Sequence, residues 1–167
     1  NPHTIEYLGE YVDIPVSVYD LGDPTVIVTH DSSAIVNNVL GDYLVSYNAT
    51  DKYGNVADTV YRTVVVADRT PPDIVLAWSD QNPYTVSQTT ISDYVDLGYN
   101  LSDNYDNEND ITVTYDKSGV IMSEIGTYTV SYYATDTSGN VSSTIYRTVV
   151  VADNAKPLIT VSYTHLT

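Results

Sequence analysis

Two acidic patterns in this sequence contain the ligand types of a divalent cation site. Residues 102–110 read Ser-Asp-Asn-Tyr-Asp-Asn-Glu-Asn-Asp, and the phrase Asp-x-x-Gly-Asn occurs at residues 51–55 and again at 136–140. Calcium prefers such oxygen ligands and accepts about six to eight of them. The first segment is not an EF-hand loop, because Ile111 replaces its glycine and Lys117 replaces its glutamate when counting starts at Asp106.

The Asp-x-x-Gly-Asn phrase also has a purely structural interpretation. An aspartate in such a position hydrogen-bonds the backbone two residues further on, and glycine or asparagine adopts the positive φ that a tight turn requires. We therefore predict that Asp51 and Asp136 cap turns, and we rank this above a metal role for the phrase alone.

The other reactive side chains do not form a catalytic pattern. His3, His30 and His165 are scattered, and His30 aligns with Tyr115 in the repeat described below, which favours packing. The sequence contains no phosphate-binding glycine loop and no nucleophile elbow. We predict that the protein is not an enzyme.

The overall charge restricts the partners. The chain has 22 acidic and only six basic residues, for a net charge of −16, so it should repel nucleic acid and anionic membrane surfaces. It contains no cysteine, which rules out disulfides, and no apolar run approaches the ~20 residues of a membrane-spanning helix. We expect no nucleic-acid partner and no membrane insertion.

An internal repeat organises the chain. Residues 41–68 align with residues 126–153, and 20 of these 28 positions are identical. Upstream the similarity is looser, and residues 11–13 match residues 94–96. This period predicts tandem domains, which we place at 1–70 (domain 1, lacking its first strand) and 71–156 (domain 2). Residues 157–167 resemble the opening of a third repeat, and within them we interpret 161–167 as a translated sequencing-adapter artefact.

Within each repeat, apolar and polar residues alternate. Tyr43, Val45 and Tyr47 share one face of a predicted strand, and residues 60–67 form the next strand of a hairpin. Tyr43 and Tyr128 stand where a tyrosine corner would tie down a crossover between sheets. The pattern predicts an all-β chain with two tandem immunoglobulin-like β-sandwich domains without disulfides.

These residues also resemble a known family. The phrase Gly-x-Tyr-x-Val-x-Tyr-x-Ala-Thr-Asp-x-x-Gly-Asn, followed by Thr-Val-Val-Val-Ala-Asp and a proline, is similar to bacterial Ig-like repeats of the DUF5011 and HYR type. The resemblance implies an extracellular or bacterial cell-surface location. It also implies strings of such modules, so that neighbouring repeats in the same chain are partners.

The predicted sandwich suggests where a cation would bind. In such a fold, the loop between the second and third strands and the last hairpin loop lie where the chain enters the domain. In domain 2 this end faces the linker 68–73. Six carboxylates are predicted to converge there and to bind calcium, the candidate cofactor, with Arg69 as a competing ion-pair partner. They are Asp68, Asp73, Asp103, Asp106, Asp110 and Asp136.

We therefore expect a non-catalytic Ig-like repeat that acts as a stalk, spacer or adhesion segment of an exported bacterial protein, stiffened by calcium and by the consecutive prolines of the linker. The alternative is a carbohydrate-binding accessory module of a secreted enzyme or toxin. In that case a glycan would stack on exposed aromatic rings, and a surface protein is a further candidate partner. The rings considered are Trp78, Tyr99, Tyr105 and Tyr133.

Overall fold

The computed structural model describes residues 2–161 and divides the chain into two compact units, Asn1–Thr70 (unit 1) and Pro71–Thr167 (unit 2). The strands of unit 1 are β1 (His3–Glu6), β2 (Ile27–Asp31), β3 (Gly41–Thr50) and β4 (Val60–Ala67). Unit 2 contains β5 (Asp73–Leu76), the 3-10 helix η1 (Ser79–Gln81), β6 (Tyr84–Ser87), β7 (Tyr99–Ser102), β8 (Thr112–Asp116), β9 (Gly126–Thr135) and β10 (Ile145–Ala152). The all-β prediction is confirmed. A membrane-spanning helix is not found in the described residues, where η1 is the longest helix.

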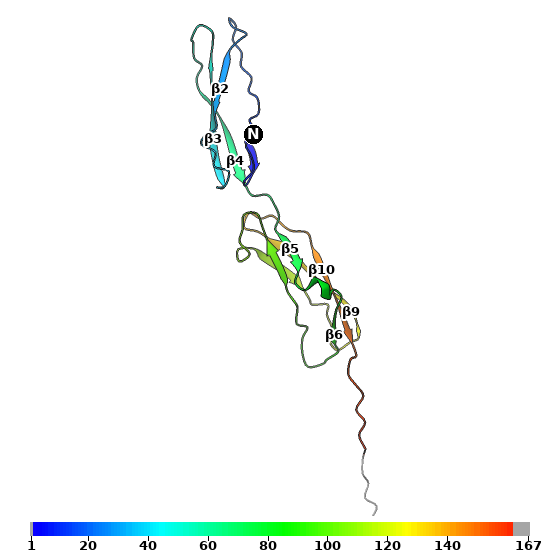
Figure 1. The fold of residues 1–167 in the computed structure, drawn as a ribbon. Helices are drawn as coiled ribbons and strands as arrows, with labels where there is room; N and C mark the ends of the chain where they lie inside the picture. Colours follow the sequence, from blue (N-terminus) through cyan, green and yellow to red (C-terminus); the bar gives the residue numbers. More distant parts are fainter. Residues whose placement is uncertain (1, 162–167) are drawn as a thin grey trace, which may run out of the picture. The chain divides into compact units, whose positions relative to one another are not determined.

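The two units contain equivalent four-stranded sheets. The strand order is β1-β4-β3-β2 in unit 1 and β6-β10-β9-β8 in unit 2. In each sheet the first strand runs parallel to the last strand of the unit, and the remaining neighbours are antiparallel (Figure 1). The repeat seen in the sequence is therefore a repeat of topology.

The alternating pattern buries one face of each central strand, as predicted. Val45 and Tyr47 of β3 are buried, and so are Val130 and Tyr132 of β9. Intervening residues such as Leu44 are exposed or half-buried. Because successive side chains of a strand point to opposite faces, this alternation decides which side of each sheet carries the core.

The two predicted tyrosine corners are present. The Tyr43 hydroxyl donates to the backbone carbonyl of Val39 at 2.9 Å, and the Tyr128 hydroxyl donates to that of Glu124 at 3.0 Å. Both bonds reach four residues back along the chain. They fix the loop that leads into β3 and β9.

The hairpin is less regular than the sequence pattern indicates. Tyr47 pairs with Val60, whereas Thr50 pairs with Val56. An advance of three residues along β3 therefore corresponds to four residues along the partner chain. This extra residue is a bulge, which bends a strand and delays its pairing. The regular strand therefore starts at Val60, and not directly after the turn at residues 51–55.

Only unit 2 has a second sheet among the described residues. β5 and β7 form an antiparallel pair in which Ile74 lies opposite Leu101, and Ile74 is buried. In unit 1 the counterpart of β7 is residues 16–19, by the match of residues 11–13 with 94–96, and these residues form no described strand. β1 is the counterpart of β6, and the described residues of unit 1 include no counterpart of β5.

The segment after β10 belongs to none of the sheets in the described part of the chain. Residues 153–161 have no regular secondary structure. Of the predicted adapter-derived residues 161–167, only Val161 is described, and 162–167 lie outside the described residues.

The tyrosine corner supports a direct stability prediction. Replacing Tyr128 with Phe removes one hydrogen bond and leaves the Glu124 carbonyl without this donor, so we expect a loss of about 1 kcal/mol in the free energy of unfolding of unit 2. Urea denaturation, monitored by hydrogen exchange of the β9 amides, measures this loss of stability. Tyr146→Phe is the matched control, because Tyr146 is 59% exposed, and it should change stability little. Equal effects of the two variants would contradict a stabilising role for the corner.

Candidate functional site: acidic loops and a tyrosine–aspartate–arginine network

The Asp-x-x-Gly-Asn phrase forms a capped turn in both units. The Asp136 carboxylate accepts the backbone N–H of Asn140 at 2.7 Å and its side-chain amide at 2.8 Å. Asp51 accepts the same two donors from Asn55, both at 2.7 Å. Gly139 has a φ of 89°, a conformation that glycine adopts without steric cost. The turn interpretation is confirmed.

A second carboxylate holds each turn from the side. In unit 2, the Asp106 carboxylate accepts the Thr137 hydroxyl at 2.7 Å and the Thr137 backbone N–H at 3.2 Å. In unit 1, Asp23 accepts the backbone N–H of Lys52 at 2.8 Å. Lys52 and Thr137 are equivalent positions of the repeat. The loop before β2 or β8 is therefore clamped to the hairpin turn by an aspartate in both units.

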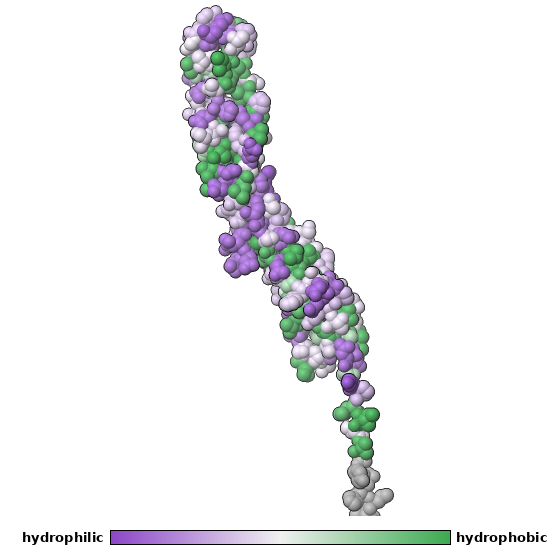
Figure 2. All heavy atoms as spheres, in the orientation of Figure 1, coloured by the Kyte–Doolittle hydropathy of each residue, from purple (hydrophilic) through white to green (hydrophobic). Residues whose placement is uncertain are grey.

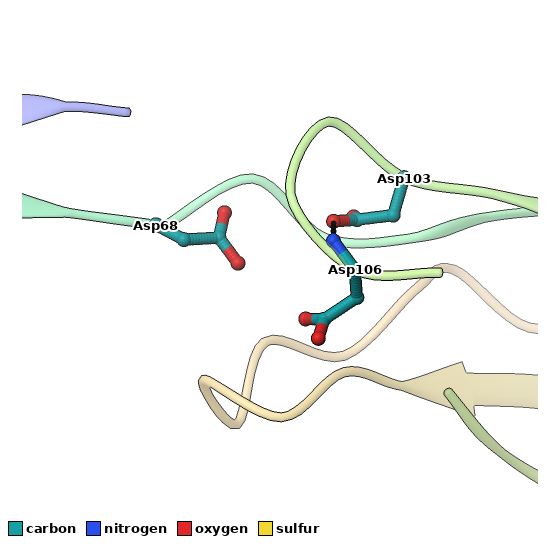
Figure 3. A group of neighbouring side chains, drawn as sticks. All are labelled: Asp68, Asp103 and Asp106. Atoms are coloured by element: carbon teal, nitrogen blue, oxygen red, sulfur yellow. Dashed lines mark hydrogen bonds between the residues drawn. The ribbon is translucent and has the colours of Figure 1, made fainter. Parts of the chain in front are cut away.

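The Asp103 carboxylate closes its own loop. One of its oxygens accepts the backbone N–H of Tyr105 at 2.8 Å. The same oxygen accepts the backbone N–H of Asp106 at 2.9 Å (Figure 3). Asp103 directly follows β7, so these bonds turn the chain sharply as it leaves the small sheet. The acidic segment thus contains a hydrogen-bonded loop in which the Asp103 and Asp106 carboxylates accept protein donors.

Five of the six predicted calcium ligands lie at one end of unit 2. Asp73 begins β5 and Asp103 follows its partner strand β7, while Asp106 contacts the residue after Asp136. Asp110 lies near the start of β8, whose first residue pairs with the end of β9. These acidic loops, Asp73 with residues 103–110 and 136–140, can offer several carboxylate oxygens to a cation.

The sixth predicted ligand, Asp68, belongs to unit 1. It follows β4, is buried, and accepts the backbone N–H of Thr70 at 3.2 Å. Arg69, which we expected to compete for the carboxylates, pairs with Glu6 of unit 1 at 3.5 Å. The calcium assignment stays a prediction.

The hydrogen bonds of the unit 1 loops favour their ionised carboxylates. The Thr25 hydroxyl and the Lys52 and Thr25 backbone N–H groups lower the pKa of Asp23 below its usual value. The side-chain amide and backbone N–H of Asn55 do the same for the pKa of Asp51. These groups therefore carry negative charge at neutral pH as part of the fold, independently of any ligand.

A second cluster, which the sequence reasoning missed, centres on Asp96 in unit 2. Its carboxylate accepts the Tyr94 hydroxyl at 2.8 Å, the Tyr132 hydroxyl, and the Gly98 backbone N–H at 2.7 Å. Arg147 of β10 is completely buried, with Nε 3.8 Å from the Asp96 carboxylate. Burial and the bond to Asp96 raise the pKa of both phenols well above the usual range, so both remain donors.

Arg147 joins the two sheets of unit 2. Its Nη2 donates to the carbonyl of Ala77 at 2.7 Å and to that of Gly98 at 2.9 Å. Ala77 follows β5 and Gly98 precedes β7, so one guanidinium from the large sheet holds adjacent ends of both strands of the small sheet. A buried charge needs such acceptors, because desolvation otherwise costs several kcal/mol.

Unit 1 repeats the network in a more open form. Asp13 accepts the Tyr11 hydroxyl at 2.6 Å, the Tyr47 hydroxyl at 2.5 Å and Arg62 Nη1 at 2.8 Å. Burial raises the pKa of Asp13, but the tyrosine hydrogen bonds, together with His30 and Arg62, outweigh it and place the pKa below the usual value. The Arg62 side chain is 21% exposed, compared with 0% for Arg147.

The signal for this network was present in the repeat. Tyr11 and Asp13 align with Tyr94 and Asp96, and residues 47 and 62 align with 132 and 147. Two tyrosines, an aspartate and an arginine that recur together in both repeats indicate that these side chains contact one another in each unit. Their separation along the chain, 49 residues between Asp13 and Arg62, hides that contact from local patterns.

The rings at the equivalent positions 30 and 115 pack on the networks of their own units, as the sequence predicted. His30 lies 6.0 Å from the Tyr47 ring, and Tyr115 stacks on Tyr132 at 6.1 Å between centroids. Among the rings considered for sugar binding, Tyr99 turns inward against Tyr132 at 6.2 Å. Trp78 is 64% exposed and Tyr133 is 37% exposed.

Comparison with known proteins assigns the family. A model of the bacterial Ig-like domain (group 3) matches residues 28–119, more than half of the chain. The chain belongs to the bacterial Ig-like domain family. The finer DUF5011 or HYR type stays a prediction.

Two curated proteins are similar to this bacterial Ig-like chain. An uncharacterised 81.3 kDa protein of Acholeplasma phage L2 is 29% identical over 140 residues, which cover 83% of this chain and 18% of that protein. Internalin I of Listeria monocytogenes serotype 4b (strain F2365) is 31% identical over 132 residues, covering 79% of this chain and 7% of that protein. The chain therefore spans less than a fifth of either relative.

The buried network supports a second stability prediction. Asp96→Asn removes the negative charge that faces Arg147 and leaves a buried cation uncompensated, so we expect unit 2 to lose about 3 kcal/mol or more in free energy of unfolding. Hydrogen exchange of the β9 and β10 amides, measured at increasing denaturant concentration, gives this loss. The control Asp93→Asn changes an exposed carboxylate and should be nearly neutral. A loss below about 1 kcal/mol for Asp96→Asn would contradict the assigned role, because exposed pairs contribute no more than that.

Proposed function

We propose that this chain is a non-catalytic spacer segment, built from two tandem Ig-like domains, of an exported bacterial surface protein. The observation that carries the proposal is the recurrence of one set of structural devices in both units: the tyrosine corner, the capped turn, the aspartate clamp and the tyrosine–aspartate–arginine network. These residues are engaged in holding strands and loops together.

The family and the relatives support the same proposal. Bacterial Ig-like modules match more than half of the chain, and the segment is similar to a small part of much longer proteins, one of them Internalin I. A module that occupies a small share of a long chain fits a spacing or presenting role. The extracellular or cell-surface location follows from the same likeness and is part of the proposal.

The linker supports limited flexibility between the domains. Pro71 and Pro72 are consecutive, and each proline fixes φ near −65° and favours an extended path. The spacer proposal therefore includes a restricted range of distances between the two units.

We also propose that calcium stiffens this segment through the acidic loops of unit 2. The supporting observation is that five of the six predicted ligands lie at one end of that unit. Each aspartate that caps a turn still has lone pairs for a cation, because a carboxylate has about four acceptor positions. The participation of Asp68 is part of the sequence-based prediction and needs its own variant.

Spin-label distances test the spacer proposal. The chain has no cysteine, so Asn38→Cys and Ser118→Cys place one label on an exposed position of each unit. We expect a single narrow distance distribution, close in width to that of a control pair within unit 2, Asn100→Cys with Ser118→Cys. A distribution as broad as that of a flexible chain would contradict the spacer proposal.

Thermal melts test the calcium proposal separately. We expect millimolar calcium, but not magnesium, to raise the melting temperature of unit 2 relative to EDTA, because a ligand at about 100 times its Kd adds about 2.7 kcal/mol to the folded state. Asp103→Asn and Asp106→Asn should abolish the rise in melting temperature. The control Asp93→Asn should leave it intact, and Asp68→Asn tests separately whether the sixth predicted ligand takes part. A rise that is absent, or equal for both metals, would refute calcium binding while leaving the spacer proposal standing.

A further inference from the structure

The outer face of the large sheet of unit 2 carries exposed tyrosines that lie outside the core. Figure 2 shows hydrophilic, intermediate and hydrophobic residues intermingled over the visible face of each unit, so hydropathy alone does not mark a docking surface there. Strand register does identify one. Tyr132 of β9 and Arg147 of β10 are buried on the core side. Because successive side chains of a strand point to opposite faces, Ser131, Tyr133 and Tyr146 point to the outer face.

Two tyrosines and a carboxylate surround a small residue on this face. Ser131 is the direct cross-strand partner of Tyr146 on β10 and of Asp116 on β8. Tyr133 is the diagonal neighbour of Tyr146, and such neighbours lie about 7–8 Å apart, within reach of aromatic side chains. Tyr146 is 59% exposed and Tyr133 is 37% exposed. The small side chain of Ser131 therefore lies among three larger ones. We call this set the tyrosine platform: Tyr133, Tyr146, Ser131 and Asp116.

Hydroxyl groups lie beside the tyrosine platform. Thr148 pairs with Thr129, and Thr114 pairs with Tyr133, all on the same outer face. Thr114 and Thr129 are exposed, and Thr148 is half-buried. The face therefore combines two aromatic rings with hydroxyls that can both donate and accept hydrogen bonds.

Asp116 is the charged member of the platform. One of its oxygens accepts the backbone N–H of Ser118 at 2.8 Å. The side-chain and backbone hydrogen bonds from Ser118 lower the pKa of Asp116, so the carboxylate is ionised at neutral pH. Since a carboxylate has about four acceptor positions, others are left for the hydroxyl donors of a ligand.

Part of the platform recurs in unit 1. Tyr61, Ser46 and Asp31 occupy the equivalent positions and pair in the same way across β4, β3 and β2. Tyr61 is 64% exposed. Asn48 stands where unit 2 has Tyr133, so unit 1 offers one ring in place of two. The row of tyrosine, serine and aspartate is thus a property of the repeat, and the pair of rings is a property of unit 2.

We propose that the tyrosine platform of unit 2 binds a neutral glycan made of β-1,4-linked pyranose rings. A pyranose ring in such a chain has apolar C–H faces and a rim of hydroxyls. Tyr133 and Tyr146 pack against the C–H faces, while Asp116 and the neighbouring hydroxyls bond to the rim. This binding would add to the spacer role and does not depend on it.

Charge and polarity favour this ligand over others. A chain of net charge −16 with an ionised carboxylate in the site repels glycans that carry phosphate, sulfate or carboxylate groups. Threonines and serines occupy much of the face, whereas the buried centre of a protein–protein interface is more apolar. A neutral ligand rich in hydroxyls matches both features.

NMR titration of the intact, ¹⁵N-labelled chain tests the assignment. The probes are cellohexaose, chitohexaose and a form of cellohexaose carboxylated at C6. We expect a neutral probe at millimolar concentration to shift the amide resonances of β8, β9 and β10 in a saturable way. The carboxylated probe should bind about tenfold more weakly or worse, because its charges face Asp116. No shift with either neutral probe, or equal binding of the carboxylated one, would overturn the proposal.

Matched variants identify the rings that bind. Tyr133→Ala and Tyr146→Ala should each weaken binding about tenfold, whereas Tyr146→Phe keeps the ring and should stay within roughly twofold. The control is Tyr53→Ala, at a turn position of unit 1 that is 72% exposed, and circular dichroism confirms that each variant is folded. Equal effects of Tyr146→Ala and Tyr53→Ala would overturn the proposal. Shifts of the same amides on raising the protein concentration without sugar would assign the face to a second copy and overturn the glycan assignment.

Discussion

Each unit depends on an aspartate carboxylate that accepts hydrogen bonds from two tyrosines and faces an arginine. In unit 2 the arginine is completely buried. A buried guanidinium is tolerated only where its charge is compensated. Asp96 faces this charge, and the carbonyls of Ala77 and Gly98 accept hydrogen bonds from Nη2, whereas Nε and Nη1 have no hydrogen-bond partner among the described residues. The requirement fixes the ends of β5 and β7 against β10, and thereby closes the core between the two sheets.

The two units show what the first strand contributes. Their central hairpins are almost the same sequence, yet unit 2 buries Ala134 and Arg147 completely while Ala49 and Arg62 remain partly exposed. The difference lies in β5, which supplies Ile74 to the core and is followed by the Ala77 carbonyl.

Much of this fold follows from local patterns in the sequence. The alternation in β3 and β9, the tyrosine corners and the Asp-x-x-Gly-Asn turns are each encoded within about ten residues, and the structure confirms them. The bulge before Val60 does not appear in the alternation, because the intervening residues carry no pattern of their own. The partners of Asp96 and Asp106 are distant in sequence, so only the pairing of strands brings them together. Topology predicts where the candidate calcium ligands lie, and five of the six do lie in loops at one end of unit 2.

The most direct test of this account compares hydrogen exchange in the two central hairpins. Because 20 of 28 aligned residues are identical, the intrinsic exchange rates of β3–β4 and β9–β10 are closely matched. If closure by β5 and the buried Arg147 network stabilises a unit, the amides of β9 and β10 should be protected at least about tenfold more than their equivalents in β3 and β4. Equal protection of the two hairpins, or stronger protection in unit 1, would contradict the central role assigned to the network and its closing strand.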